Sequence, residues 1–138
     1  MTSIIVDTSV VVKWFSEENE DDYLKARQIK ARIVEGTLSL ICPEIIALEL
    51  INVLTYSKKF TQDECTHCVK SFIELCSDVV PLPDLDRTID SVHRYTLASY
   101  DAAFVTLAMM RNVHLITADY KHHKKSISPH IVWLSEWK

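Results

Sequence analysis

Residues 4–12 read IIVDTSVVV and place one carboxylate, Asp7, between two apolar runs. The first run is continuous rather than alternating, which is typical of a strand buried on both faces of a parallel sheet. Residues 8–15 then have the pattern of a short helix, with Thr8 or Ser9 placed to cap it. A carboxylate in this setting is costly unless something compensates its charge, so Asp7 is a candidate functional residue.

Strand-like and helix-like segments alternate along the rest of the chain. The expected strands are 3–6, 38–41, 79–80, 113–117 and 131–133. The expected helices are 8–15, 17–34, 43–57, 84–97 and 100–111, the last with Ser99 as its N-cap. A further helix is expected to begin at the capping box 61–64, and a short one to follow Asp119. This alternation predicts one α/β domain over residues 1–138, a three-layer α/β/α arrangement around a mainly parallel sheet of four to five short strands. Such sheets bind ligands beyond the carboxyl ends of their strands, where Asp7 and Asp119 fall.

Composition and charge exclude several classes of function. Gly36 is the single glycine, so a glycine-rich phosphate-binding loop is excluded. The net charge of −4 gives no general attraction to nucleic acid or to anionic membranes. A polyanionic partner would therefore need a local basic patch or a bound cation. No apolar run approaches the ~18 residues of a membrane span, and the N-terminus lacks a signal-peptide layout, so we expect a cytoplasmic protein without membrane association.

The cysteines raise a redox or metal alternative. Cys65 and Cys68 form a CxxC pair, but together with Val69, Phe72 and Cys76 they recur at helical intervals and form one apolar stripe. No second CxxC pair is present to complete a zinc site. We therefore interpret the pair as part of the hydrophobic core.

Three further carboxylates stand in unexpected places. Glu49 lies in the apolar stripe of its predicted helix, where an unpaired charge would cost several kcal/mol. Asp101 lies between apolar neighbours on its own helix, and Asp119 follows a strand end as Asp7 does. Each of them, taken alone, is also explained as a helix cap, an ion-pair partner or a polar loop residue.

The four carboxylates together point to a metal ion. If Asp7, Glu49, Asp101 and Asp119 converge at one edge of the sheet, each pair of like charges repels by ~1 kcal/mol or more even when well screened. A hard divalent cation relieves this repulsion, and Mg²⁺ takes carboxylate and water oxygens in an octahedral shell. No histidine pair at zinc spacing competes for the role. The sequence therefore predicts a magnesium site.

Four short motifs resemble, in the correct order, those of the PIN-domain ribonuclease family, which includes toxins of the VapC type. IVDTS at 5–9 resembles the opening motif, and the segment 43–54 around Glu49 resembles the second. SYDAAFVTLA at 99–108 resembles the third, and LITAD at 115–119 resembles the fourth. The match spans essentially the whole chain.

The resemblance implies an α/β/α sandwich and hydrolysis of RNA phosphodiester bonds by one or two Mg²⁺ or Mn²⁺ ions. The implied metal-binding catalytic residues are Asp7, Glu49, Asp101 and Asp119, and the hydroxyls that would orient carboxylates or metal-bound waters are those of Thr8, Ser9 and Thr117. A cation held there would lower the pKa of a bound water and clamp the scissile phosphate. The resemblance also implies a homodimer and an antitoxin partner.

A basic stretch, KHHKK, directly follows the fourth acid. Lys121, Lys124 and Lys125 are candidates for RNA phosphate contacts, and Lys13 is a weaker candidate of the same kind. The alternative interpretation of the stretch is a solvated helix end.

Two other classes of function compete with the ribonuclease. A PIN-like fold can serve as a non-catalytic RNA- or protein-binding module, although the presence of all four acids argues against it. A receiver-like phospho-acceptor domain also places an Asp at a strand end, but Asp7 has no acidic neighbour in its loop. We therefore predict an Mg²⁺- or Mn²⁺-dependent endoribonuclease, the toxin of a toxin–antitoxin pair.

Overall fold

Five short strands form one parallel sheet in the computed structural model, which describes all residues 1–138. The strands are β1 (Thr2–Val6), β2 (Leu38–Pro43), β3 (Cys76–Val80), β4 (His114–Thr117) and β5 (Ile131–Trp133), in the order β3-β2-β1-β4-β5. Every neighbouring pair is parallel. The predicted sheet is confirmed, although its third strand begins at Cys76 rather than at Val79.

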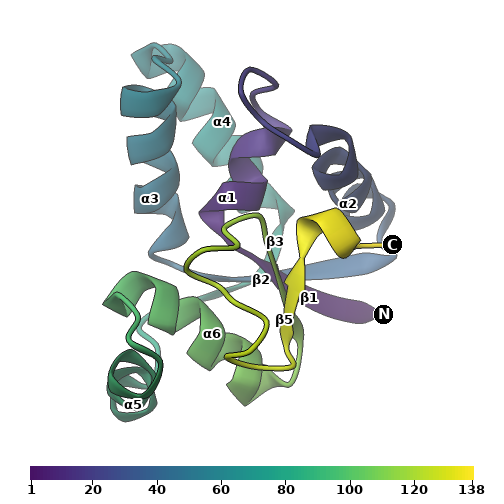
Figure 1. Ribbon diagram of the computed structural model, residues 1–138. Coiled ribbons are helices and arrows are strands. Elements are labelled where there is room, and N and C mark those ends of the chain that lie inside the picture. The colour runs from purple at the N-terminus through teal and green to yellow at the C-terminus, as the bar shows by residue number, and fades with distance from the viewer.

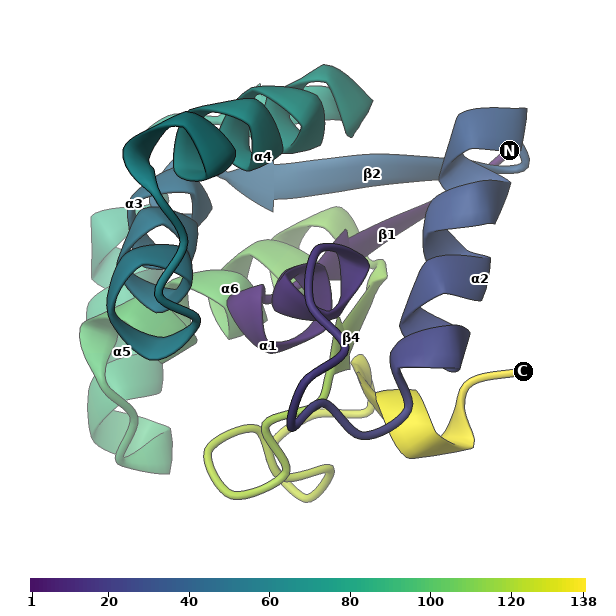
Figure 2. The ribbon, with the colours of Figure 1, turned by 90° about the horizontal axis from the view of Figure 1, so that it is seen from above.

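Helices cover both faces of this sheet (Figures 1 and 2). They are α1 (Thr8–Val11) with the 3₁₀ turn η1 (Val12–Trp14), α2 (Tyr23–Glu35), α3 (Ile46–Asn52) with the π-helix η2 (Val53–Ser57), α4 (Gln62–Leu75), α5 (Leu85–Tyr95), α6 (Ser99–Arg111) and the final 3₁₀ turn η3 (Leu134–Glu136). The helix α6 packs against β1, β2 and β4 with α5 on its outer side, and α1, α2 and α4 lie on the opposite face. This is the predicted three-layer α/β/α sandwich.

The hydrophobic core fills the space on both sides of the central strand. Phe72 of α4 and Phe104 of α6 are among the largest fully buried side chains, and β1 itself is buried between them. Burial of each such side chain contributes about 1.5–3 kcal/mol. Cys65 and Cys68 are free thiols and are buried, which confirms their interpretation as core residues. None of the helices combines the length and the apolar character that a membrane crossing requires.

The second helix begins later than predicted. It starts at Tyr23, because the acidic residues before it form turns rather than a first helical turn. Asp22 adopts a left-handed conformation with φ of 57°. Glu20 is turned away toward two ammonium groups, those of Lys13 at 3.0 Å and Lys58 at 2.6 Å. These ion pairs explain the position of Glu20.

Three other features of the helices also differ from the predictions. The helix expected from 43 begins at Ile46, because Pro43 continues β2. Ser99 is the first residue of α6 and not its N-cap, since Ala98 occupies that position and no side chain caps the helix. The short helix expected after Asp119 is absent, and residues 118–130 form successive turns. Serines and a proline in this segment favour turns over a continued helix.

Candidate metal centre

The four predicted acids gather at the carboxyl edge of the sheet. Asp7 directly follows β1 and Asp119 follows β4, and these two strands are parallel neighbours. Glu49 lies in the first turn of α3, and Asp101 lies in the first turn of α6. Both helices begin near this edge (Figure 1). Four elements that are distant in sequence thus each bring one carboxylate to the same region.

Asp7 is buried and is held by two hydroxyl groups. Its residue is 4% exposed. Ser9 donates a hydrogen bond to Oδ1, and Thr117 donates one to Oδ2 at 2.5 Å. Burial raises the pKa of Asp7 above its ordinary value, although His123 and the two hydroxyls oppose the rise. The protein therefore compensates the burial of this carboxylate only in part.

The same two hydroxyls connect Asp7 to the backbone that follows β4. The Ser9 hydroxyl accepts a hydrogen bond from the Ala118 N–H at 2.9 Å, and the Thr117 hydroxyl accepts one from the Asp119 N–H at 3.0 Å. The prediction that Thr8 or Ser9 caps α1 is wrong, because Asp7 is the N-cap residue and no side chain caps this helix. The hydroxyls of Thr8 and Ser9 donate to the carboxylates of Glu49 and Asp7 instead.

Glu49 faces the same region from α3. The Thr8 hydroxyl donates to its Oε1 at 3.3 Å. Partial burial raises the pKa of Glu49 to about 7, and the negative charges of Asp101 and Asp7 add to the rise. A carboxyl group that titrates near neutrality lacks a full positive partner in the protein. A divalent cation would supply that partner.

A histidine that the sequence did not single out lies between two of the acids. His123 is 1% exposed, and its Nε2 lies 3.5 Å from Asp7 Oδ2 and 3.5 Å from Asp101 Oδ1. Burial by itself lowers the pKa of His123, but the hydrogen bond with Asp101 and the surrounding carboxylates outweigh it and raise the pKa. The other ring nitrogen, Nδ1, is buried without a hydrogen-bond partner.

One sequence signal could have found this residue. The KHHKK stretch contains two adjacent histidines, and in a turn two neighbouring side chains point in different directions. His122 is the exposed one, and its Nδ1 lies 2.9 Å from Asp119 Oδ2. The Asp119 carboxylate also accepts the backbone N–H of His122 at 3.2 Å. This local turn directs His123 inward, and hydrophobic periodicity does not reveal it.

The four lysine candidates divide into two groups. Lys121 and Lys124 make no ion pair and, with His122, line a surface depression of about 440 Å³. Lys125 pairs with Glu136 at 2.8 Å. Lys13 is 6% exposed and is engaged by Glu20, so its ammonium is not presented to solvent. Two of the four lysines are therefore available beside the acids.

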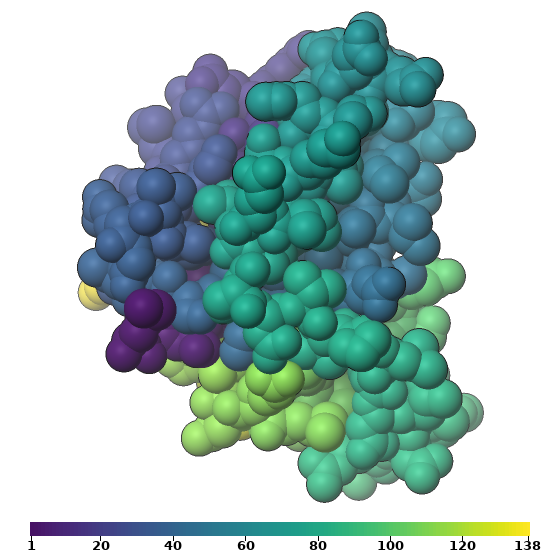
Figure 3. Space-filling view, turned by 180° about the vertical axis from the view of Figure 1, so that it is seen from behind, coloured from purple at the N-terminus to yellow at the C-terminus, as the bar shows by residue number.

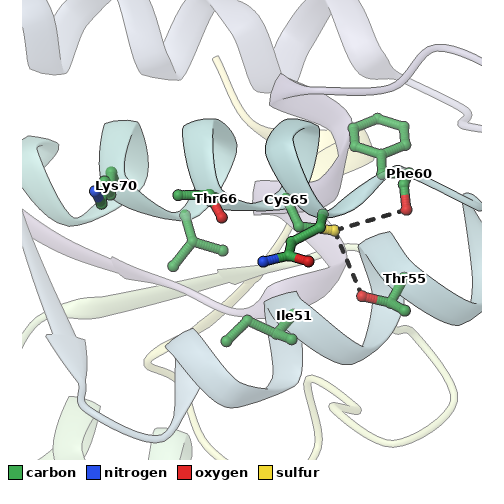
Figure 4. A pocket seen from close by; sticks show the side chains of 8 residues that line it. Ile51, Thr55, Phe60, Cys65, Thr66 and Lys70 are labelled. Carbon is green, nitrogen blue, oxygen red and sulfur yellow. Dashed lines mark hydrogen bonds between the residues drawn. The ribbon is translucent and has the colours of Figure 1, made fainter.

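A largely apolar cavity lies elsewhere, between α3 with η2 and the start of α4 (Figure 4). It has a volume of about 520 Å³, and its lining includes Ile51, Phe60 and Cys65. The Cys65 thiol lies 3.4 Å from the Thr55 hydroxyl. No carboxylate lines this cavity, so it is separate from the acidic centre.

The chemistry of the donor set fits a hard divalent cation. Carboxylate oxygens from four elements are the ligands that Mg²⁺ and Mn²⁺ prefer. Burial raises the pKa of both Asp7 and Glu49. As the side chains stand, however, no three His, Cys, Asp or Glu groups lie close enough to hold one ion. The imidazole of His123 lies 3.5 Å from both Asp7 and Asp101.

The fold and the site define an α/β/α sandwich with an acidic centre at the carboxyl edge of a parallel sheet. The model of the PIN domain family matches residues 4–127, and the chain therefore belongs to this family. The predicted resemblance is thus confirmed.

Two solved structures share the fold. The crystal structure of PAE2754 from Pyrobaculum aerophilum has 18% sequence identity and a TM-score of 0.70, over 97% of this chain and 85% of that chain. A toxin–antitoxin complex from Klebsiella pneumoniae has 16% identity and a TM-score of 0.66, over 94% of this chain and 95% of that chain. At such identities the similarity shows the fold alone. No curated protein sequence matches the chain significantly.

Proposed function

We propose that the chain is a divalent-metal-dependent endoribonuclease. The observation that carries the proposal is the set of four carboxylates at the sheet edge of a PIN domain, of which Asp7 and Glu49 have raised pKa values through burial. When bound, Mg²⁺ or Mn²⁺ lowers the pKa of a water molecule and stabilises negative charge on the scissile phosphate. An RNA phosphodiester is the substrate class that this chemistry serves.

The chain's own side chains would hold this cation and orient its ligands. Asp7, Glu49 and Asp101 would hold the cation, with Asp119 beside them. Ser9 and Thr117 fix the carboxylate of Asp7 by donating to its two opposite oxygens, and Thr8 fixes Glu49. Such hydrogen bonds orient metal ligands and restrict their rotation.

We propose Lys121 and Lys124 as the residues that contact the RNA backbone. Both are exposed and unpaired, and the depression that they line also includes His122, the partner of Asp119. Lysine contacts to phosphate add affinity that depends on salt but not on base sequence. Because Lys13 and Lys125 are held by glutamates, their part in RNA binding is smaller.

We also propose that the protein acts in the cytoplasm as the toxin of a toxin–antitoxin pair. The solved toxin–antitoxin complex that shares this fold covers nearly the whole chain, which supports the assignment. The partner would be an antitoxin protein that masks the acidic centre.

A homodimer is proposed from a group of exposed apolar side chains on α3, α5 and the loop between β3 and α5. Leu48 is 60% exposed, Leu82 73%, Leu85 53% and Ile89 55%. Leu48 and Leu82 line one shared cavity, and exposed apolar patches of this kind mark interaction sites. In Figure 3, α4 runs down the middle of the view, with α3 beside it and α5 at the lower right. The double variant Leu48→Asp with Leu85→Asp should be monomeric by sedimentation, whereas an unchanged mass would refute the assigned surface.

The central test is RNA cleavage by the purified protein with added Mg²⁺ or Mn²⁺, or with a chelator. Cleavage is expected only with the metal, and Asp7→Asn or Asp101→Asn should abolish it. Glu44→Gln is the matched control, because this exposed acid precedes α3 and is not part of the centre. Unchanged cleavage by the two Asn variants would assign the activity to a contaminant and overturn the proposal.

One observation favours the non-catalytic alternative, a PIN-like module that binds RNA or protein. His123 already supplies a partner to both Asp7 and Asp101 in place of a cation. Calorimetry separates the two functions. Heat of Mn²⁺ or Mg²⁺ binding that is lost in Asp7→Asn supports the nuclease, whereas RNA binding without metal binding or cleavage supports the module.

A further inference from the structure

Two cysteines from neighbouring strands have their sulfur atoms in contact. Cys42 lies near the carboxyl end of β2, and Cys76 is the first residue of β3. Their Sγ atoms are 3.0 Å apart. A covalent S–S bond is about 2.05 Å long, so a shift of about 1 Å would bring the two sulfurs to bonding distance.

An irregularity in the sheet accompanies this contact. Cys76 pairs with Leu40, and the register between β2 and β3 then shifts, so that Cys42 is opposite Val79. Cys76 also ends α4 as its C-cap residue, and its thiol donates to the carbonyl of Phe72 at 3.5 Å. The thiol of Cys76 is thus held at the junction of a helix and a strand, beside that of Cys42.

The two thiols differ in accessibility and in acidity. Cys42 is 0% exposed, whereas Cys76 is partly accessible to solvent. The hydrogen bond from Cys42 lowers the pKa of Cys76, and the same contact together with burial raises the pKa of Cys42. An oxidant therefore meets Cys76 first, since thiolate character and exposure control reactivity.

We propose that Cys42 and Cys76 form an oxidation site that a peroxide converts into an intramolecular disulfide. The Cys76 sulfur attacks one peroxide oxygen, the O–O bond breaks, and a sulfenic acid and one water are formed. The Cys42 sulfur then attacks the sulfenic sulfur, the S–O bond breaks, and its hydroxyl leaves as a second water with the Cys42 proton. Overall, two thiols lose two hydrogens and one peroxide is reduced to two waters.

The disulfide would close a loop that carries part of the acidic centre. Residues 42–76 include α3, η2 and α4, and therefore Glu49. A cross-link across this loop restricts the unfolded chain and stabilises the folded one. It also fastens the two ends of the helical segment to one another.

The CxxC pair on α4 provides an internal comparison. The Cys65 thiol contacts the Thr55 hydroxyl at 3.4 Å and the Phe60 carbonyl at 4.0 Å. Cys65 and Cys68 are 9% and 7% exposed and have no sulfur–sulfur contact of this kind. The pair that looks redox-active by its spacing is therefore the one that we expect to stay reduced.

The test is treatment of the reduced full chain with hydrogen peroxide, followed by intact mass and by peptide mapping without reductant. Loss of two hydrogens, about 2 Da, with a linked Cys42–Cys76 peptide is expected, and a thiol reductant should reverse it. The oxidised protein should melt about 5–10 °C higher.

Matched variants decide the assignment. Cys76→Ser should abolish both the mass change and the thermal shift, and Cys76→Ala replaces it if the serine variant does not fold by circular dichroism. Cys68→Ser should retain both effects. A linked Cys65–Cys68 peptide, an intermolecular dimer, a sulfinic acid at Cys76 without a disulfide, or no reaction would each overturn the proposal.

Discussion

Asp7 and Asp119 each follow an apolar strand directly, yet the fold surrounds the two carboxylates differently. Asp7 follows the central strand, is 4% exposed and accepts hydroxyls from Ser9 and Thr117. The Asp119 side chain is 34% exposed and is bound by His122 of its own loop. β1 has two neighbours on each side, whereas β4 has only the short β5 beyond it. The place of a strand in the sheet, and not the local motif, therefore decides how deeply the carboxylate that follows it is buried.

The difference predicts unequal losses of activity. Asp7→Asn should reduce metal-dependent RNA cleavage about 1000-fold or more, and Asp119→Asn about tenfold, which is a gap of about 3 kcal/mol in the barrier. Single-turnover cleavage measures both. Equal losses in the two variants would show that burial does not rank these acids.

Removal of His123 should destabilise the metal-free protein by about 3 kcal/mol at pH 6, because the buried Asp7 then loses its partner. The substitution is His123→Asn, measured by urea unfolding. The folded pKa of His123 is raised, so its stabilisation is complete below pH 6.5 and is lost as the pH rises through that folded pKa. The difference in unfolding free energy between the wild type and His123→Asn should therefore be smaller at pH 9. His122→Asn is the exposed control, and an equal loss there would contradict the role of His123.

The hydroxyl of Thr117 should contribute both to stability and to metal binding. Thr117→Val leaves one oxygen of the buried Asp7 without its donor, at a cost of about 2 kcal/mol. The affinity for Mn²⁺ in calorimetry should fall about 10–100-fold. Thr106→Val is a matched control, because Thr106 is buried in a hydrogen bond with Ser91 and does not contact the four acids. Loss of metal affinity in the control as well would indicate a general packing defect.

The raised pKa of Glu49 predicts a pH-dependent stability. Between the unfolded value of 4.5 and the folded value of about 7, the native state holds the proton more tightly than the unfolded state. The metal-free protein should thus lose stability as the pH rises through this range. Glu49→Gln should reduce the slope by about 1 kcal/mol over the range, after allowance for solvent screening. Parallel pH profiles of the variant and the wild type, in urea unfolding, would refute this.

The smallest effects are expected from the lysines beside Asp119. Lys121→Ala and Lys124→Ala should each weaken RNA binding a few-fold and lower the slope of log affinity against log salt by about 0.7. Fluorescence titrations at several salt concentrations measure this. Lys125→Ala should change the slope less, because Glu136 already pairs with that ammonium. If Lys125→Ala changed the salt slope more than Lys121→Ala or Lys124→Ala, the RNA would contact Lys125 rather than the two proposed lysines.

Features that depend on periodicity were predictable from the sequence. Continuous apolar runs located the strands and the carboxylates at their ends. Helical apolar periodicity located the helices and the carboxylates on their buried faces. Glu49 and Asp101 stood out because each interrupts an apolar stripe. The capping box of α4 was also predictable, and both of its hydrogen bonds are present between Thr61 and Glu64.

Features that depend on one turn or one long-range ion pair were not predictable. The inward direction of His123 follows from turns after Asp119, where a helix was expected. The late start of α2 follows from the contacts of Glu20 with Lys13 and Lys58, which come from different parts of the chain. Neither contact leaves a periodic trace, so local propensity alone suggested a longer helix.

The hydroxyl partners of Asp7 also fix when the centre is completed during synthesis. Ser9 is two positions from Asp7, but Thr117 is 110 positions away, and Ser9 meets the Ala118 N–H across 109 positions. The ribosome releases Asp7 early and β4 among the last elements. Until β4 joins the sheet, Asp7 has one hydroxyl partner, no neighbour on one side of its strand and no Asp119. The group of four acids in a nascent chain therefore stays incomplete while the chain is still close to the RNA of the ribosome that synthesises it.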